Sequence, residues 1–328
     1  MRKEDFLEKW IGFILIIIIG SIAYKVAKLN KALDPLVLGI VFGMLVRTVF
    51  STKTNLFIDL KYSYKIFIPV GIILYGVNLQ FHRLSHVPVV AWFELIMGIV
   101  IVFFVSIYLG RKLSLKKELS FLIGIGTAIC GASAIAIASP VVNAESEETG
   151  VSLVTITIWG MIGVLVYPVF LTFLNIPKVE YAFLCATTLH MTGFVKIAAG
   201  ALGDSCVNLA LSIKMARTAM IIPIIWFLCW HNAMEKGTGE KNILFYVPWF
   251  LWVFILMGLL TSFLPVLTPA IKPLKLCAEI IFTIALTSIG LNVDLRNILD
   301  IGGGALITGL ITWLSLICVF VLFKGFIF

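Results

Sequence analysis

The chain has 328 residues, of which 61% are hydrophobic and 13% are charged, and its mean hydropathy is +1.09. No water-soluble domain has this balance, so the composition predicts an integral membrane protein with several spans. The net charge of +8 does not indicate a nucleic-acid partner, because no basic patch is interleaved with aromatic residues and the Lys and Arg lie between hydrophobic runs.

The apolar runs predict transmembrane helices. They are about 20 residues long and lack the alternation of barrel strands. At roughly 30 residues for a span and its loop, the chain accommodates about eleven spans. We place them within one membrane domain, 1–328, at 11–28, 34–50, 63–80, 88–109, 118–142, 149–173, 180–202, 206–229, 243–264, 269–291 and 303–327.

The first span is expected to be retained rather than cleaved as a signal. Acidic residues lie among the basic ones before it, and no small-residue cleavage site follows it. About 15 Lys and Arg fall on the side of the N-terminus and about 7 on the other side. The positive-inside rule therefore predicts a cytoplasmic N-terminus and, with eleven spans, a C-terminus outside.

The span 118–142 has an unusual middle. Where bulky aliphatic residues are normal, it carries Cys130, Gly131 and Ser133, with Thr127 one turn earlier. One interpretation is a helix broken at the midplane, which is the usual binding device of secondary transporters. The other is close packing of small residues between helices. Under the first interpretation, these four residues are candidates for substrate binding, and the freed N–H groups suit an anion.

An internal inverted repeat is expected because many transporters consist of two such halves. Residues 1–33 would form an extra N-terminal span, 34–175 the first repeat and 176–328 the second. This register aligns Pro69 with Pro223 and places 118–142 against 269–291, after which Asn292 is a further candidate for substrate binding. A second similarity, between 76–81 and 290–295, supports another register, so the alignment stays open.

Ionisable side chains within the predicted spans need an explanation, since each costs roughly 2.5–3.5 kcal/mol at the bilayer centre. They are Glu94, His190, Lys196, Lys214, Arg217 and Glu279. Lys214 and Arg217 share one helix face and would repel each other without an anion or a carboxylate nearby. Three interpretations remain open: a site for an anionic substrate, ion pairs with Glu94 or Glu279, and a misplaced span.

His190 is a candidate with two interpretations. A lone buried histidine is commonly a hydrogen-bonded core residue. Here Thr192 and two other threonines lie nearby, and histidine takes up a proton near neutral pH. We therefore include His190 and Thr192, with Lys214 and Arg217, among the residues expected to bind substrate.

No enzyme signature is present, so we expect a protein that is not an enzyme. The sequence has no GxSxG, HExxH or GxxxxGK[ST] motif. The six cysteines are scattered without metal-ligand spacing or a disulfide pattern. We therefore expect neither a cofactor nor a metal.

The stretch from Gly124 to Ala136, GIGTAICGASAIA, followed by Pro140, resembles the signature of the YeiH/YadS family of bacterial membrane proteins. Members of that family are labelled sulfate exporters. The resemblance continues at 71–79 and 198–200, and at Lys214 and Arg217. Around the histidine the chain departs from the family pattern, because Met191 and Phe194 stand where an acidic residue and a glutamine are common.

The resemblance implies a fold of the cation/proton antiporter and anion transporter group, similar to bile-acid symporters. Such folds are all-helical, with inverted repeats, discontinuous crossing helices, and a panel and a core domain. The resemblance also implies elevator-type motion, a homodimer in the bacterial inner membrane, and H⁺ or Na⁺ as the coupling ion. We therefore expect a secondary transporter that exports a small anion such as sulfate, sulfite or an organosulfonate. A passive anion channel and a membrane protein without transport activity are the alternatives.

Overall fold

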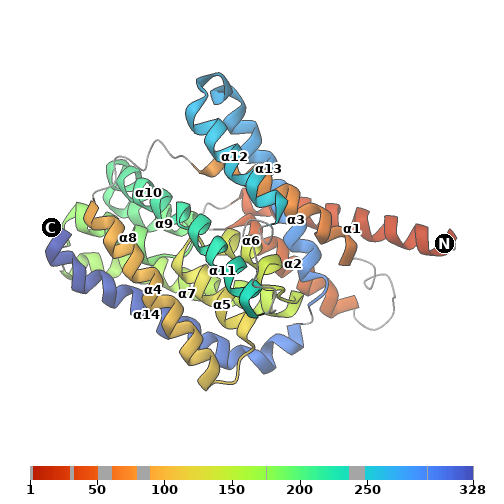
Figure 1. The fold of residues 1–328 in the computed structure, drawn as a ribbon, viewed down its shortest axis with the longest axis horizontal. Coiled ribbons are helices and arrows are strands. Elements are labelled where there is room, and N and C mark those ends of the chain that lie inside the picture. The colour runs from red at the N-terminus through yellow and green to blue at the C-terminus, as the bar shows by residue number, and fades with distance from the viewer. Residues whose placement is uncertain are drawn as a thin grey trace. The chain divides into compact units, whose positions relative to one another are not determined.

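The computed structural model describes residues 3–29, 33–50, 61–79, 89–174, 176–235, 248–293 and 295–327. These ranges form helices and short turns without any strand (Figure 1). Five of their helical stretches are long and apolar enough to cross a membrane: Ala91–Lys112, Ser146–Leu171, Asp204–His231, Pro269–Gly290 and Gly302–Gly325. The chain is therefore an all-helical polytopic membrane protein. The number of eleven spans stays a prediction.

The chain forms two compact units. Unit 1 comprises Met1–Leu79, Ala144–Val151 and Val247–Ile301, and unit 2 comprises Gln80–Asn143, Ser152–Tyr246 and Gly302–Phe328. Each unit therefore contains residues from both predicted repeats, 34–175 and 176–328.

Unit 1 is built around one helix. Its helices are α1 (Lys3–Ala27), α2 (Pro35–Phe50), α3 (Lys61–Tyr75), η2 (Gly76–Asn78), α12 (Trp249–Phe263), η6 (Pro265–Leu267) and α13 (Thr268–Gly290). The central helix, α13, packs against α1, α2 and α3. Asp34 begins α2 by accepting the N–H of Leu36 at 2.8 Å, and the proline that follows it suits the first helical position.

Small residues bring α2 and α13 into close contact. A Cβ atom at Gly43 would lie 2.5 Å from the carbonyl oxygen of Thr287, and one at Gly39 would lie 2.6 Å from that of Thr283. Glycines four residues apart allow two membrane helices to approach backbone to backbone. α13 is continuous from Thr268 to Gly290, so the span that the repeat register places against 118–142 is not interrupted.

Unit 2 contains two interrupted spans. Its helices are α4 (Val89–Lys112), α5 (Lys117–Ala128), α6 (Ala132–Val142), most of α7 (Ser146–Leu174), α8 (Lys178–Thr188), α9 (Thr192–Ala199), η4 (Gly200–Leu202), α10 (Asp204–Ala219), α11 (Ile221–Glu235) and most of α14 (Leu295–Ile327). The predicted span 118–142 is divided into α5 and α6. The predicted span 180–202 is likewise divided, into α8 and α9.

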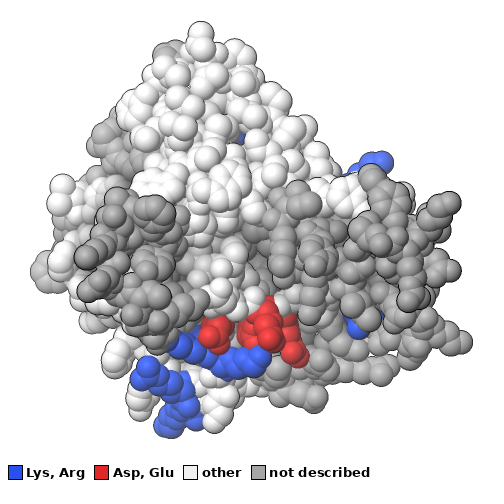
Figure 2. Space-filling model, turned by 45° about the vertical axis from the view of Figure 1, so that its right-hand side comes forward, with Lys and Arg blue, Asp and Glu red and all other residues white. Residues whose placement is uncertain are grey.

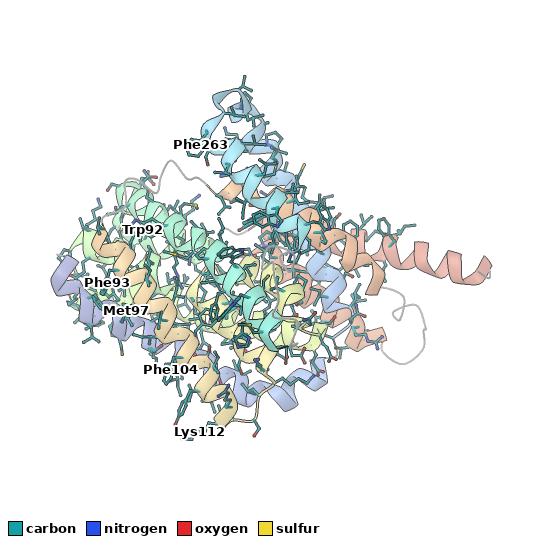
Figure 3. All side chains as sticks on the ribbon, viewed as in Figure 1. Trp92, Phe93, Met97, Phe104, Lys112 and Phe263 are labelled. Atoms are coloured by element: carbon teal, nitrogen blue, oxygen red, sulfur yellow. The ribbon has the colours of Figure 1, made fainter. Side chains whose placement is uncertain are left out.

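One side of α4 is apolar and exposed. Phe93 is 56% and Phe104 71% exposed, and both are labelled along α4 with Lys112 at its end (Figure 3). Most of the described surface in Figure 2 carries no charged side chain. An exposed apolar helix face of this kind suits contact with lipid. Glu94 is buried on the same helix, with 2% exposure.

Candidate functional site

The interruption between α5 and α6 covers Ile129, Cys130 and Gly131. Gly131 has φ 75° and ψ −126°, and glycine reaches positive φ without the steric cost that a Cβ atom brings. The Gly131 carbonyl accepts the first bond of α6, from the N–H of Ile135 at 3.1 Å. The sequence predicts the opening at residues 130–133, and the structure places it one to two residues earlier. Ser133 therefore lies in the first turn of α6.

The interruption between α8 and α9 covers Leu189, His190 and Met191. Leu189 and Met191 are extended, with ψ 143° and 149°. The segment contains neither glycine nor proline, so its composition carries no signal of a break. Neighbouring side chains must supply the partners of its backbone groups, because lipid cannot do so.

The two interruptions contact each other. A Cβ atom built on Gly131 would lie 2.7 Å from Cγ of Met191 and 3.3 Å from the carbonyl oxygen of His190. Gly131 precedes the first residue of α6, and Met191 precedes the first residue of α9. The N-terminal ends of these two helices therefore lie side by side. We call the place where the two interruptions, 129–131 and 189–191, meet the crossing.

Lys214 binds both interruptions from α10. Its side chain is completely buried, and Nζ donates to the carbonyl oxygens of Ile129 at 2.9 Å, Leu189 at 2.7 Å and His190 at 2.8 Å. An ammonium group has three donors. All three are used on backbone carbonyls that the broken helices leave unpaired.

Arg217 completes the same arrangement one turn along α10. Its side chain is 1% exposed and donates only to backbone carbonyls. These belong to Ala128 at 2.7 Å, Leu189 at 2.8 Å, Ala186 at 3.1 Å and Thr127. The acceptors are carbonyls in the last turns of α5 and α8 and that of Leu189, which directly follows α8. The negative ends of these two helix dipoles therefore face two cations.

Polar side chains also lie at the start of α6. Sγ of Cys130 is 2.9 Å from Oγ of Ser133, and both residues are buried. Thr192 begins α9. The first N–H groups of a helix have no carbonyl partner within it, so the first turns of α6 and α9 bring such donors to this point. Neither helix has an acidic residue in its first turn.

Two buried polar side chains of the crossing lack partners within the described part of the chain. Oγ1 of Thr127 has no hydrogen bond, and neither ring nitrogen of His190 has one. The His190 ring lies 6.2 Å from that of Trp313 and is completely buried. An unpaired buried polar group costs roughly 1–3 kcal/mol, so these atoms point to a ligand or water at the crossing.

Of the three other ionisable candidates, Glu94 is the one that lies near the crossing. Its carboxylate lies beside the Thr187 hydroxyl and within the field of Arg217. Lys196 is exposed on α9. Glu279 and Asn292 belong to unit 1, where the Asn292 amide donates to the carbonyl of Ser288 at 2.7 Å.

Aromatic side chains surround the crossing, and the sequence carries no signal for them. Tyr167 on α7 shares a 2.6 Å hydrogen bond with the Thr188 hydroxyl on α8, and its ring stacks on Trp313 at 6.2 Å. Aromatic residues are common throughout membrane helices, so nothing in the sequence distinguishes these two. Within the described ranges, no cluster of His, Cys, Asp and Glu is suited to a metal ion.

Comparison with known proteins gives one family. The conserved pattern of a family described as Conserved hypothetical protein 698 matches residues 11–309. The chain belongs to this family. It is the YeiH/YadS type that the Gly124–Ala136 stretch resembles.

Relatives in this family come from bacteria and archaea. A UPF0324 membrane protein of Listeria monocytogenes serotype 4b is 31% identical over 304 residues, covering 90% of this chain and 88% of its own. One of Archaeoglobus fulgidus is 31% identical over 304 residues, covering 92% and 88%. One of Brucella melitensis is 29% identical over 292 residues, covering 88% and 80%. No solved structure matches the chain significantly.

Proposed function

We propose that this UPF0324 protein is a secondary-active transporter of a small anion, which binds between the N-terminal ends of α6 and α9. The observation that supports the proposal is the difference between the two kinds of helix end at the crossing. Lys214 and Arg217 bind the carbonyl ends of α5 and α8, whereas the amide ends of α6 and α9 have no acidic residue in their first turns.

A count of charges at the crossing supports an anionic ligand. Each helix end carries about half an elementary charge, so two carbonyl ends and two amide ends cancel. Lys214 and Arg217 add two positive charges, and Glu94 removes one. About one positive charge is left, in surroundings where Coulomb interactions are stronger than in water.

The donors at this point suit an oxyanion. Backbone N–H groups at a helix N-terminus bind sulfate and phosphate without further help, and the Ser133 hydroxyl and the Cys130 thiol lie beside them. This chemistry fits sulfate, sulfite and organosulfonates. The burial of these residues favours a carrier, which encloses its substrate, over an open channel. The export direction, the elevator-type motion, the dimer and the membrane orientation stay predictions.

The first test is the thermal stability of the detergent-purified protein with sulfate, sulfite, methanesulfonate or chloride at equal ionic strength. A ligand that binds the native state stabilises it by roughly 2.7 kcal/mol at a hundredfold excess over Kd. We expect an oxyanion to raise the melting temperature above the chloride control. An equal response to all four salts would contradict an anion site.

The second test is counterflow of labelled sulfate into liposomes that contain the protein and an excess of unlabelled sulfate. A carrier gives saturable uptake that depends on the internal anion. Uptake that rises without saturation and ignores the internal anion would indicate a channel instead.

A further inference from the structure

Glu94 is a buried carboxylate, and the anion site proposed above gives it no role. It lies on α4, is 2% exposed, and one of its oxygens, Oε2, has no hydrogen-bond partner within the described part of the chain. A buried carboxylate with an unpaired oxygen is costly. A single negative charge beside an anion site would also weaken the binding of the anion.

The immediate neighbours of Glu94 do not neutralise it completely. The Thr187 hydroxyl lies beside it, and the charge of Arg217 acts on it. However, the hydrogen bonds of Arg217 go to backbone carbonyls of α5 and α8. The guanidinium group thus holds the crossing together, and within the described part of the chain Glu94 forms no ion pair with it.

The other charged groups on the surrounding helices have different positions or partners. Lys214 on α10 donates to three carbonyls of the crossing. Lys324 on α14 pairs with Glu180 on α8 at 2.9 Å. Further titratable groups on these helices include Lys117 and Glu118 on α5, Lys178, Tyr181 and Cys185 on α8, Asp204 and Cys206 on α10, Cys229 and His231 on α11, and Cys318 on α14. Arg217 is thus the cation that acts on Glu94 from the crossing itself.

We propose that Glu94 takes up one proton when the anion binds, so that the protein carries an anion together with a proton. This inference rests on the anion site proposed above. A carboxylate that accepts a proton becomes neutral, and the positive charge at the crossing rises from about one to about two. The proton comes from the aqueous phase, and no bond is broken in the protein. With sulfate, the bound pair has a net charge of minus one.

Reciprocity makes the coupling measurable. If the anion promotes protonation of Glu94, protonation must promote anion binding by the same factor. His190 is a less suitable proton acceptor, because an imidazolium there would add a third positive charge beside Lys214 and Arg217. The coupling therefore predicts an anion affinity that falls as the pH rises, by at most tenfold per pH unit for one proton.

The experiment is calorimetric titration of sulfate and methanesulfonate into the purified protein, in buffers that differ in ionisation enthalpy. Both anions are fully ionised at the working pH, so any proton taken up binds to the protein. We expect uptake approaching one proton per anion in the wild type. We expect none in Glu94→Gln, together with an affinity that no longer depends on pH. The matched control Glu118→Gln removes a carboxylate at the start of α5 and should keep the uptake.

Infrared difference spectra of the wild type give an independent readout, should Glu94→Gln fail to fold. Adding sulfate should produce the C=O band of a protonated carboxylic acid. Anion binding without proton uptake, or full uptake in Glu94→Gln, would overturn this inference and leave the anion site standing. The absence of anion binding in the wild type would overturn both.

Discussion

At the helix crossing in unit 2, the carbonyl ends of α5 and α8 have charged side chains of the chain as partners, whereas the first turns of α6 and α9 contain no such partner. On the carbonyl side, α5 and α8 end against Lys214 and Arg217. Lys214 makes three hydrogen bonds to backbone carbonyls and Arg217 makes four. On the amide side, α6 and α9 begin at Gly131 and Met191 with no acidic residue in their first turns.

This difference separates what holds the crossing together from what the crossing can bind. Carbonyl groups inside a membrane protein must be paired, and two residues of the chain itself provide the pairing permanently. On the amide side, neither α6 nor α9 has an acidic side chain in its first turn to pair with its first N–H groups. A site that is complete on one side and open on the other is suited to a ligand that comes and goes. The two sides should therefore respond differently to substitution.

The largest effect is expected on the carbonyl side. Lys214→Met keeps an apolar stem of similar length but leaves the carbonyls of Ile129 and His190 without their donor, while the Leu189 carbonyl keeps only Arg217. Each unmade buried hydrogen bond costs roughly 1–3 kcal/mol, so the variant should lose about 2–6 kcal/mol and unfold or disperse on purification. Size-exclusion profile and melting temperature measure this.

Lys196→Met is the matched control, because Lys196 is exposed on α9. It should change stability by about 0.5 kcal/mol or less. The sequence alone leads to another expectation, in which Lys214 and Arg217 contact the anion and can be replaced without unfolding. A folded Lys214→Met protein that had lost only its response to oxyanions would favour that first interpretation.

On the amide side we expect an effect on binding rather than on folding. Ser133→Ala removes one hydroxyl from the first turn of α6. A hydrogen bond to a charged group is worth roughly 1.5–3 kcal/mol, so the Kd for sulfate should rise about tenfold to a hundredfold while the melting temperature without ligand changes little. Ser212→Ala is the control, because that hydroxyl is exposed on α10 and bonds to Asn208 of its own helix. Equal affinities in both variants would contradict a site at α6.

The contact between the two sides depends on Gly131. In Gly131→Ala, the backbone conformation with positive φ costs about 1–3 kcal/mol, and the new Cβ atom would meet Met191 Cγ at 2.7 Å. We expect a lower melting temperature and weaker sulfate binding. Gly193→Ala lies nearby in α9 and has open space around its Cβ position, so it should be nearly silent.

A double variant separates the two causes of the Gly131→Ala effect. Met191→Ala removes the atom that the new Cβ would meet, so it should restore part of the stability lost, and backbone strain should account for the rest. If the double variant gained nothing, the close approach of the two interruptions would not be what constrains Gly131.

The sequence predicts one interruption and misses the other for a physical reason. Gly131 stands out because glycine is the residue that favours positive φ. The break at Leu189–Met191 uses ordinary residues in extended conformation, stabilised by two side chains from α10. Such a break depends on contacts between segments far apart in the chain, which local composition does not encode. The repeat register has the same weakness. It pairs 118–142 with 269–291, whereas the second interrupted span is 180–202.

For the intramembrane charges too, the sequence identifies the residues but not their partners. Sequence reasoning identifies Lys214 and Arg217 as residues that need a partner, because buried charges are expensive. The partners that a sequence suggests for such cations are an anion or a carboxylate. Backbone carbonyls become candidates only when the broken helices are seen to end there. The sequence therefore identifies Lys214 and Arg217, but only the structure identifies the carbonyl oxygens that accept their hydrogen bonds.

The smallest effect is expected at the ion pair between Lys324 of α14 and Glu180 of α8, which provides a contrast to the buried cations. Its atoms lie 2.9 Å apart, but the Lys324 side chain is 47% exposed. Exposed ion pairs are typically worth roughly 0–1 kcal/mol, because water screens the charges and two long side chains lose freedom. Lys324→Gln should therefore lower the melting temperature only slightly, and the loss should shrink further at high salt. A loss as large as that of Lys214→Met would mean that the charge itself, rather than the burial of unpaired carbonyls, determines the cost.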